Sequence, residues 1–469
     1  MLNKRINTKV SSSLLNHIKK KFSKKPQMTS KEIVDKCKEY TLFSWSAQAK
    51  INPIPMVKAE GCYFWDADGK KYFDLNSQLM CSNVGHAHPK VIQAIKDQAD
   101  ELSYAGPTFA TRARAEVGPL LAKRTPGDLN KFFFTNGGAE ANENALKIAK
   151  FYTKRNKIMT RYRSYHGASL GAITLTGDPR RWPNEPALPG VLRTFDPYAY
   201  RSLLWEKGMS EEQFSEKCLK LLEEQLMYEN PESFAAILIE TVTGTNGILA
   251  PPKGYLQGLR KLCDKYGILL WCDEVMCGLG RTGEWFAVDH YNVVPDILTM
   301  AKGLTSAYFP LGCVAISPKI AHTFDNTVLS CGLTYQSHPM GMAVATSVLN
   351  VMEEEDLVGN SKRMGKVMTS LMQDLMKKHP SVGETRNIGL FGCFELVKSR
   401  ETREPLAPYG GSSDACNKVV GYLRENGVFV FCGANILHTN PPLCVTEKQL
   451  RDVFAIVDKA LDISDKYVL

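Results

Sequence analysis

The feature that most constrains the fold is a series of short apolar runs, several of them separated by helical patterns. The runs span residues 131–135, 234–241, 267–273, 296–300 and 311–316, and the clearest helical patterns span 139–152 and 211–226. Continuous apolar runs of this length are typical of strands that are buried on both faces of a parallel sheet. The sequence therefore predicts an α/β fold with a large, doubly wound, mainly parallel sheet.

After about residue 345 the pattern changes. Longer helices are predicted around 342–355 and 360–378, and short strands near 390–397 and 427–431. This change predicts a smaller α+β domain built from the two chain ends. We expect a leader at 1–31, an N-terminal segment at 32–100 that packs with the small domain, a large domain at 101–345 and the small C-terminal domain at 346–469.

The leader contains nine Lys or Arg residues and no acid, whereas the rest of the chain has 49 basic and 49 acidic residues. A neutral body gives no electrostatic case for nucleic acid as a partner. The leader is basic and acid-free, contains serines and has apolar residues at helical spacing. This composition predicts a mitochondrial transit peptide and a location in the matrix. A plain basic tail on a cytoplasmic protein is the alternative. No run of 18 apolar residues predicts a membrane span.

Thirteen cysteines are scattered along the chain without a CxxC pair or a Cys/His cluster at zinc spacing. This pattern predicts reduced, mostly buried thiols, and it predicts no metal site.

The segment Phe132 to Glu140 (FFFTNGGAE) predicts a strand that leads through two glycines into a helix. Free backbone N–H groups and the positive end of the helix dipole would bind a phosphate there. A simple turn between strand and helix is the alternative interpretation.

Two other predicted strands end in charged residues. Asp273 ends a very apolar run, at the edge where open α/β sheets bind ligands, and a buried carboxylate there needs a cationic partner. Lys302 follows another apolar run, and an amine in a closed apolar pocket has a lowered pKa and forms a Schiff base with an aldehyde. A capping acid and a surface lysine are the ordinary alternatives.

Together these motifs resemble, from about Tyr40 to the C-terminus, the class III aminotransferases of fold type I, which use pyridoxal 5'-phosphate. The resemblance implies that Lys302 holds the cofactor as a Schiff base and that Asp273 faces its ring nitrogen. It also implies a homodimer with shared active sites, which transfers an amino group from a small-molecule donor to a keto acid by a ping-pong mechanism. The other implied cofactor contacts are Gly138 and Ala139 at the phosphate, Tyr165 on the ring, Val275 behind it, Glu240 at a strand end and Thr334 toward the neighbouring subunit.

The segments 43–48 (FSWSAQ), 85–89 (GHAHP) and 244–247 (GTNG) resemble the ω-amino acid:pyruvate branch, which includes taurine and β-alanine aminotransferases. Branches that use glutamate have an arginine shortly before a Pro-Pro pair and a gating glutamate, where this chain has His438 and Thr245. The resemblance therefore implies pyruvate as the acceptor and Trp45 and His438 in the substrate pocket. Arg161, Arg163 and Arg386 are candidates for binding the acceptor's carboxylate.

Two groups of alternatives stay open. The same residues serve other class III chemistry: 4-aminobutyrate or other 2-oxoglutarate-linked transamination, decarboxylation, racemisation or aminomutase activity. A non-catalytic structural subunit would keep the fold without the reaction, although the intact Lys302 and Asp273 speak against it.

Overall fold

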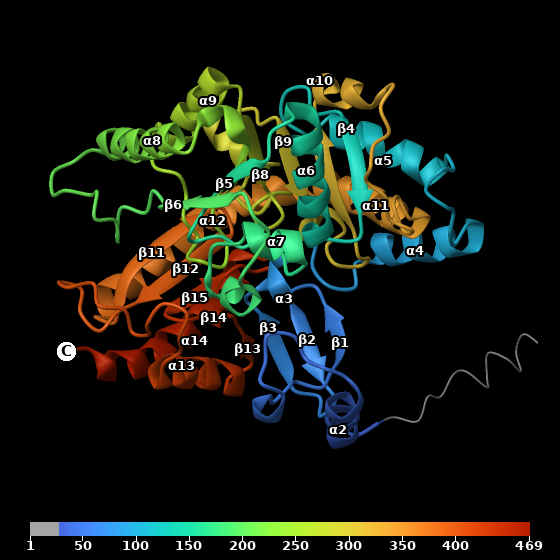
Figure 1. Cartoon of the computed structure of the whole chain (residues 1–469). Helices are drawn as coiled ribbons and strands as arrows, with labels where there is room; N and C mark the ends of the chain where they lie inside the picture. The colour runs from blue at the N-terminus through green and yellow to red at the C-terminus, as the bar shows by residue number, and fades with distance from the viewer. Residues whose placement is uncertain (1–27) are drawn as a thin grey trace, which may run out of the picture. The chain divides into compact units, whose positions relative to one another are not determined.

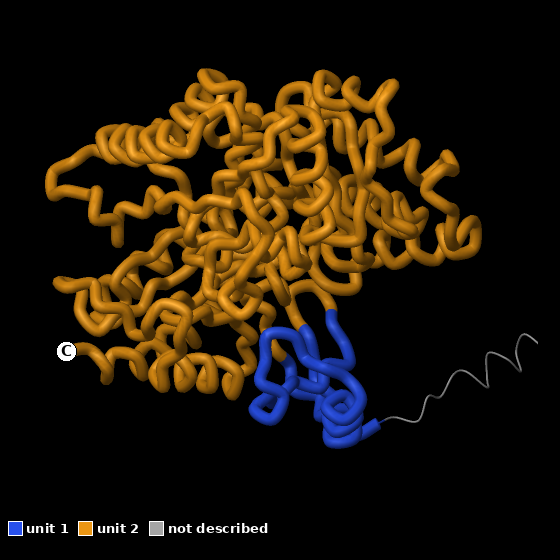
Figure 2. The backbone as a smooth tube through the Cα atoms, in the orientation of Figure 1, with its two compact units in different colours: residues 1–59, 64–71 blue, residues 60–63, 72–469 orange. Residues whose placement is uncertain are grey.

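The computed structural model describes residues 28–469, so nearly all of the predicted leader lies outside the described residues. The chain forms two compact units (Figure 2), the first of residues 1–59 and 64–71 and the second of residues 60–63 and 72–469. The domain boundaries predicted at residues 100 and 345 stay predictions. No helix within residues 28–469 combines the length and the apolar character that a membrane span requires.

The described residues of the first unit form helix α2 (Ser30–Tyr40), the short helix η1 (Gln48–Lys50) and most of the neighbouring strands β1 (Met56–Glu60) and β2 (Tyr63–Asp66). Helix α2 begins with a capping box, in which the Thr29 hydroxyl accepts from the Glu32 backbone N–H and the Glu32 carboxylate accepts from the Thr29 backbone N–H. These bonds satisfy N–H groups that the helix itself leaves unpaired.

The second unit is organised around a seven-stranded sheet of order β4-β10-β9-β8-β7-β5-β6 (Figure 1). All of its pairings are parallel except those of β10, which is antiparallel to both neighbours. The strands are β4 (Lys131–Thr135), β5 (Lys157–Arg161), β6 (Val191–Thr194), β7 (Phe234–Glu240), β8 (Leu269–Asp273), β9 (Ile297–Met300) and β10 (Gly312–Ile316). The predicted mainly parallel sheet and its five predicted strands are confirmed, whereas β5 and β6 were not predicted.

Both faces of this sheet are covered, as continuous apolar strands require. Along β8, Leu269 and Trp271 pack in the cluster that includes helix α6, whereas Leu270 and Cys272 pack in the larger cluster on the other face. Helix α6 packs against β10, β9, β4 and β7, and Figure 1 shows it beside β4. The helices of this region are α4 (Pro89–Glu101), α5 (Arg112–Ala122), α6 (Gly138–Thr153), α7 (Leu170–Leu175), α8 (Glu211–Tyr228), α9 (Tyr255–Tyr266), α10 (Pro318–Ala321) and α11 (Pro339–Glu354).

The C-terminal part of the second unit contains a four-stranded sheet of order β11-β12-β15-β14 with helices against it. Its elements are α12 (Leu357–Lys378), β11 (Val382–Ile388), β12 (Phe391–Leu396), α13 (Asp414–Glu425), β13 (Val428–Phe429), β14 (Cys432–Gly433), β15 (Ile436–Thr439) and α14 (Glu447–Ser464). Strand β13 pairs in parallel with the end of β3 (Lys71–Asp74), which brings distant parts of the sequence together.

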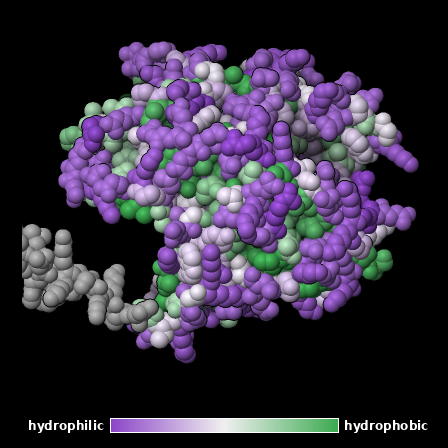
Figure 3. Space-filling view, turned by 180° about the vertical axis from the view of Figure 1, so that it is seen from behind, coloured by the Kyte–Doolittle hydropathy of each residue, from purple (hydrophilic) through white to green (hydrophobic). Residues whose placement is uncertain are grey.

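The parallel strands of the large sheet direct their carboxyl ends to one edge, where the loops after β4, β5, β7, β8 and β9 meet. These loops contain the polar residues that the sequence singles out. On the face shown in Figure 3, hydrophobic residues gather in patches among hydrophilic ones.

Candidate active site

A cavity of about 530 Å³ lies at the carboxyl edge of the large sheet. Apolar side chains such as Leu79, Met276 and Phe309 form part of its wall. Of the residues predicted to bind the cofactor, seven line it: Gly138, Ala139, Tyr165, Glu240, Asp273, Val275 and Lys302. The structure therefore brings together residues from five separate loops, as a ligand site at this edge requires.

The start of helix α6 forms one end of the cavity. Its N-cap residue, Gly137, makes no side-chain capping bond, and Gly137, Gly138 and Ala139 all line the cavity. A Cβ atom on Gly138 would lie 2.9 Å from Val275 Cγ1, so glycine lets the start of α6 lie this close to the loop after β8. An uncapped start of a 16-residue helix is a good fit to a phosphate group.

Asp273 is held by three donors at the end of β8. Its Oδ2 accepts from Asn142 Nδ2 and His166 Nδ1, both at 2.8 Å, and its Oδ1 accepts from the Val275 backbone N–H at 3.0 Å. Thr299 in turn donates to Asn142 Oδ1 at 2.8 Å, which orients the amide. This buried carboxylate is therefore fixed in one orientation, and it presents a negative charge suited to the protonated ring nitrogen of pyridoxal phosphate.

Glu240 ends the adjacent strand β7 and lines the cavity. Its carboxylate accepts from the backbone N–H groups of Tyr165, at 3.0 Å, and Gly244, at 2.8 Å. Burial, helped by the charge of Asp273, raises the pKa of Glu240 to about 7. The two bonds fix the loops that carry Tyr165 and Thr245, both of which line the cavity.

Lys302 follows β9 and has a left-handed backbone, with φ of +42°. A residue with a Cβ atom adopts this region at a cost, and such strain is concentrated at functional sites. Burial lowers the pKa of the Lys302 amine, although the nearby acids Asp273 and Glu240 oppose this effect. A neutral amine is the form that reacts with an aldehyde and accepts a proton.

Three predicted site residues lie outside the lining of this cavity. Thr334 is exposed, and its backbone oxygen accepts from the Tyr104 hydroxyl at 2.8 Å. His438 is fully buried in β15, where its ring lies 5.3 Å from that of Phe431. Trp45 belongs to the first unit, and 59% of its surface is exposed. The roles predicted for these three residues stay predictions.

None of the three arginines proposed for the acceptor's carboxylate lines the cavity. Arg386 is engaged by Glu395 at 2.7 Å, by the Gly247 carbonyl at 2.7 Å and by Glu384. Arg163 lies over the rings of Tyr198 and Tyr409 in a separate cavity.

Arg161 is buried, and its guanidinium lies 5.2 Å from the Tyr255 ring. All three arginines therefore lie outside the lining of this cavity, and their role at the acceptor's carboxylate stays a prediction.

Sequence reasoning missed Asn142, His166 and Arg180. Asn142 is a polar residue on the buried face of α6, and that placement is a signal that the sequence offers. His166 belongs to a quoted motif, but its bond to Asp273 depends on the fold. Arg180 is one of two adjacent arginines in a short helical turn, and no local pattern separates it from Arg181.

Comparison with known proteins identifies the family. The model of the class III aminotransferases matches residues 45–461. The chain is 33% identical over 450 residues to taurine–pyruvate aminotransferase from Bilophila wadsworthia, covering 92% of this chain and 96% of the relative. It is 31% identical over 418 residues to putrescine–pyruvate aminotransferase from Pseudomonas aeruginosa, covering 87% and 90%.

Among solved structures, the fold matches taurine:2-oxoglutarate aminotransferase from Bifidobacterium kashiwanohense in complex with pyridoxal phosphate and glutamate. The TM-score is 0.91 and the identity 40%, and the match covers 94% of this chain and 99% of that one. The predicted family, fold and cofactor are thereby confirmed, and so is the predicted reaction class, the transfer of an amino group from an amine to a keto acid. The chain belongs to the class III aminotransferases of fold type I and is a pyridoxal-phosphate-dependent transaminase.

Proposed function

We propose that this transaminase takes amino groups from ω-amino acids or related amines, of the taurine and β-alanine type, and delivers them to pyruvate. The observation that carries the choice of acceptor is that a fully buried histidine, His438, stands before Pro441-Pro442, where branches that use glutamate have an arginine. Burial lowers the pKa of His438 to about 3, so its ring is neutral near pH 7. This position therefore offers no positive charge to a second carboxylate, which favours a keto acid with one carboxylate.

The residues of the cavity support this reaction through their chemistry. Bound pyridoxal phosphate supplies the carbonyl group and an electron sink. The Lys302 amine, with its lowered pKa, takes a proton from the donor carbon and returns it, which is general base and general acid catalysis. Asp273 keeps a proton on the ring nitrogen, and its bonds to Asn142 and His166 hold it in place during the reaction.

The comparisons offer a second candidate, 2-oxoglutarate as acceptor. One matched structure, at 40% identity, is a taurine:2-oxoglutarate aminotransferase with bound glutamate. The pyruvate enzymes that match are 31–33% identical to this chain.

A panel of donors and acceptors separates the two candidates. The purified enzyme is assayed with taurine, β-alanine, 4-aminobutyrate and simple amines, each with pyruvate and with 2-oxoglutarate. We expect a higher kcat/KM with pyruvate for every productive donor. A higher kcat/KM with 2-oxoglutarate across the panel would replace our proposal by the second candidate.

We also propose a homodimer with shared active sites and a mitochondrial location. Thr334 is exposed on the described surface, where a second subunit could receive it, and exposed aromatic side chains, Tyr104 and Tyr335, lie near it. The acid-free basic leader supports import into mitochondria. Sedimentation of the purified enzyme tests the first proposal, and the N-terminal sequence of the mature protein tests the second.

A further inference from the structure

Arg180 lies directly beside the cavity. Its guanidinium carbon is 3.6 Å from the centre of the Tyr165 ring, and its Nη2 donates to Thr245 Oγ1 at 2.7 Å. Both Tyr165 and Thr245 line the cavity. The positive charge of Arg180 also contributes to lowering the pKa of Lys302, after the larger effect of burial.

The guanidinium is held in a fixed orientation. Asp178, which is almost fully buried, accepts from Arg180 Nε at 3.0 Å and from Nη2 at 2.5 Å. Asn246 donates to the same carboxylate oxygen of Asp178 at 3.0 Å. An arginine held by its Nε edge and stacked on an aromatic ring loses little conformational entropy when it binds an anion.

The charge balance of the cavity shows why such a cation is needed. Among the described residues that line it, Lys302 is the only lysine or arginine, whereas Glu240 and Asp273 are acidic. Lys302 is committed to the cofactor. Arg386 is paired with two carboxylates, those of Glu384 and Glu395, whereas Arg180 is paired with one, that of Asp178. A carboxylate or sulfonate on the substrate would therefore enter a site without a compensating charge unless Arg180 supplies it.

We propose that Arg180 is the anion-binding residue of the substrate site. It binds the carboxylate of the keto acid in one half-reaction and the terminal carboxylate or sulfonate of the ω-amino donor in the other. The substrate class is then amines and keto acids with one anionic group. This inference rests on the proposed function and extends it, because it names the group that the sequence left unassigned.

The test compares anionic with neutral substrates in the holoenzyme. Arg180→Gln removes the positive charge, and Arg180→Lys keeps the charge but not the planar guanidinium. Arg181→Gln is the matched control, because Arg181 lines another cavity and pairs with Glu185. Values of kcat/KM are measured for pyruvate against a short uncharged aldehyde, and for taurine against an uncharged primary amine. Binding of isethionate, a sulfonate without an amino group, is followed through the visible absorbance of the bound cofactor.

We expect Arg180→Gln to lower the preference for anionic over neutral substrates about 10- to 100-fold, mainly through KM, and to weaken isethionate binding by a similar factor. Arg180→Lys should fall between this variant and the wild type. Arg181→Gln should keep the wild-type preference.

An unchanged preference in both Arg180 variants would overturn the inference, and so would an equal loss with anionic and neutral substrates, which would mean that Arg180 only supports Tyr165. If Arg180→Gln does not fold, Arg180→Lys carries the test. Failure of the proposed function has a different signature, which is seen in the wild-type enzyme alone: either 2-oxoglutarate outperforms pyruvate across the panel, or the enzyme binds cofactor yet turns over no donor of the panel.

Discussion

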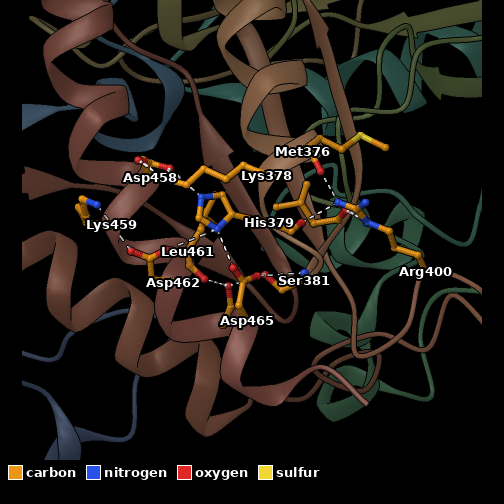
Figure 4. Close-up of polar contacts among 12 residues, drawn as sticks. Met376, Lys378, His379, Ser381, Arg400, Asp458, Lys459, Leu461, Asp462 and Asp465 are labelled. Carbon is orange, nitrogen blue, oxygen red and sulfur yellow. Dashed lines mark hydrogen bonds and ion pairs between the residues drawn. The ribbon is translucent and has the colours of Figure 1, made fainter.

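Two polar regions of the second unit satisfy their charges in different ways. One is the cavity around Lys302. The other, the His379 cluster, consists of Lys378, His379, Ser381, Asp458 and Asp465 between the end of α12 and helix α14 (Figure 4). In the His379 cluster the charged groups lie 2.6–2.7 Å from their partners. In the cavity, Asp273 is held by three donors, but Lys302 and Glu240 form no ion pair among the described residues.

The bonds of His379 explain why its cluster is structural. Its Nε2 lies 2.7 Å from Asp458 Oδ1, its Nδ1 lies 2.7 Å from Asp465 Oδ2, and Lys378 Nζ lies 2.6 Å from Asp458. His379, Asp462 and Asp465 offer ligand atoms within 4.8 Å of one another, which is compatible with a metal ion. Because carboxylates already occupy both ring nitrogens, the cluster is explained by ion pairing alone.

The pKa values record the same difference. Hydrogen bonds from Lys378 and His379 outweigh burial and lower the pKa of Asp458. In the cavity, burial dominates, so that the pKa of Glu240 rises to about 7 and the pKa of Lys302 falls. Groups that change protonation near neutral pH can carry chemistry, and groups locked in ion pairs contribute stability.

The largest effect should follow from Asp273→Asn. The variant removes the charge that faces the ring nitrogen while it keeps the shape of the side chain, so we expect kcat to fall about 10²- to 10³-fold with little change in thermal midpoint. Single-turnover kinetics with one good donor, together with thermal unfolding, measure both quantities. Activity within threefold of the wild type would contradict the assigned role.

Glu240→Gln should change the pH dependence of stability. Because the folded pKa, about 7, exceeds the ordinary value of 4.5, the native state binds more protons than the unfolded state between these pH values. The free energy of unfolding therefore falls as pH rises through this window, by about 3 kcal/mol for this group. Burial also raises the pKa of Glu274 to about 7 and lowers that of His438 to about 3, and these two groups act in both proteins, so the prediction concerns the difference in slope between the variant and the wild type.

Denaturant titrations of the cofactor-free enzyme from pH 4.5 to pH 8 measure this slope. An identical slope in the wild type and in Glu240→Gln would show that burial does not raise the pKa of Glu240. The difference in electrostatics between the cavity and the His379 cluster would then not hold for Glu240.

His379→Ala should destabilise the protein and leave the chemistry intact. The substitution removes two charge-assisted bonds, but Asp458 and Asp465 each keep some contact with water, so we expect a loss of about 2 kcal/mol. Lys377→Ala, at an exposed ion pair with Asp374, is the control and should cost about 0.5 kcal/mol or less. If His379→Ala lost activity but kept the wild-type free energy of unfolding, the cluster would have a functional role.

Much of the architecture and part of the cavity could be predicted from the sequence alone. Both faces of the sheet are covered, so its inner strands are continuous apolar runs, and such runs can be recognised in the sequence. This is why β4, β7, β8, β9 and β10 were predicted. Strand β5, which lies between β7 and β6, and the edge strand β6 were missed because their sequences, KIMTR and VLRT, mix polar residues with apolar ones. Gly138, Asp273 and Lys302 were predicted because each follows a strand that ends at the ligand edge.

The rest depends on contacts between distant segments. Arg180 and Arg181 are adjacent in sequence, yet only the first contacts the Tyr165 ring, because the fold of the turn directs the two side chains to different cavities. The two aspartates that bond His379 lie about 80 residues further along the chain, and no spacing rule predicts such a cluster. Local pattern therefore identifies the strand ends, and tertiary packing decides which charges meet.

The most direct test of the account is to find the lysine that holds the cofactor. The purified holoenzyme is treated with borohydride, which fixes the cofactor to its lysine, and is then digested and analysed by mass spectrometry. We predict a phosphopyridoxyl group on the peptide that contains Lys302 and on no other peptide, and no such group in Lys302→Ala. A label on a different lysine, or cofactor that binds without ever being fixed, would contradict the assignment of the cavity as the active site.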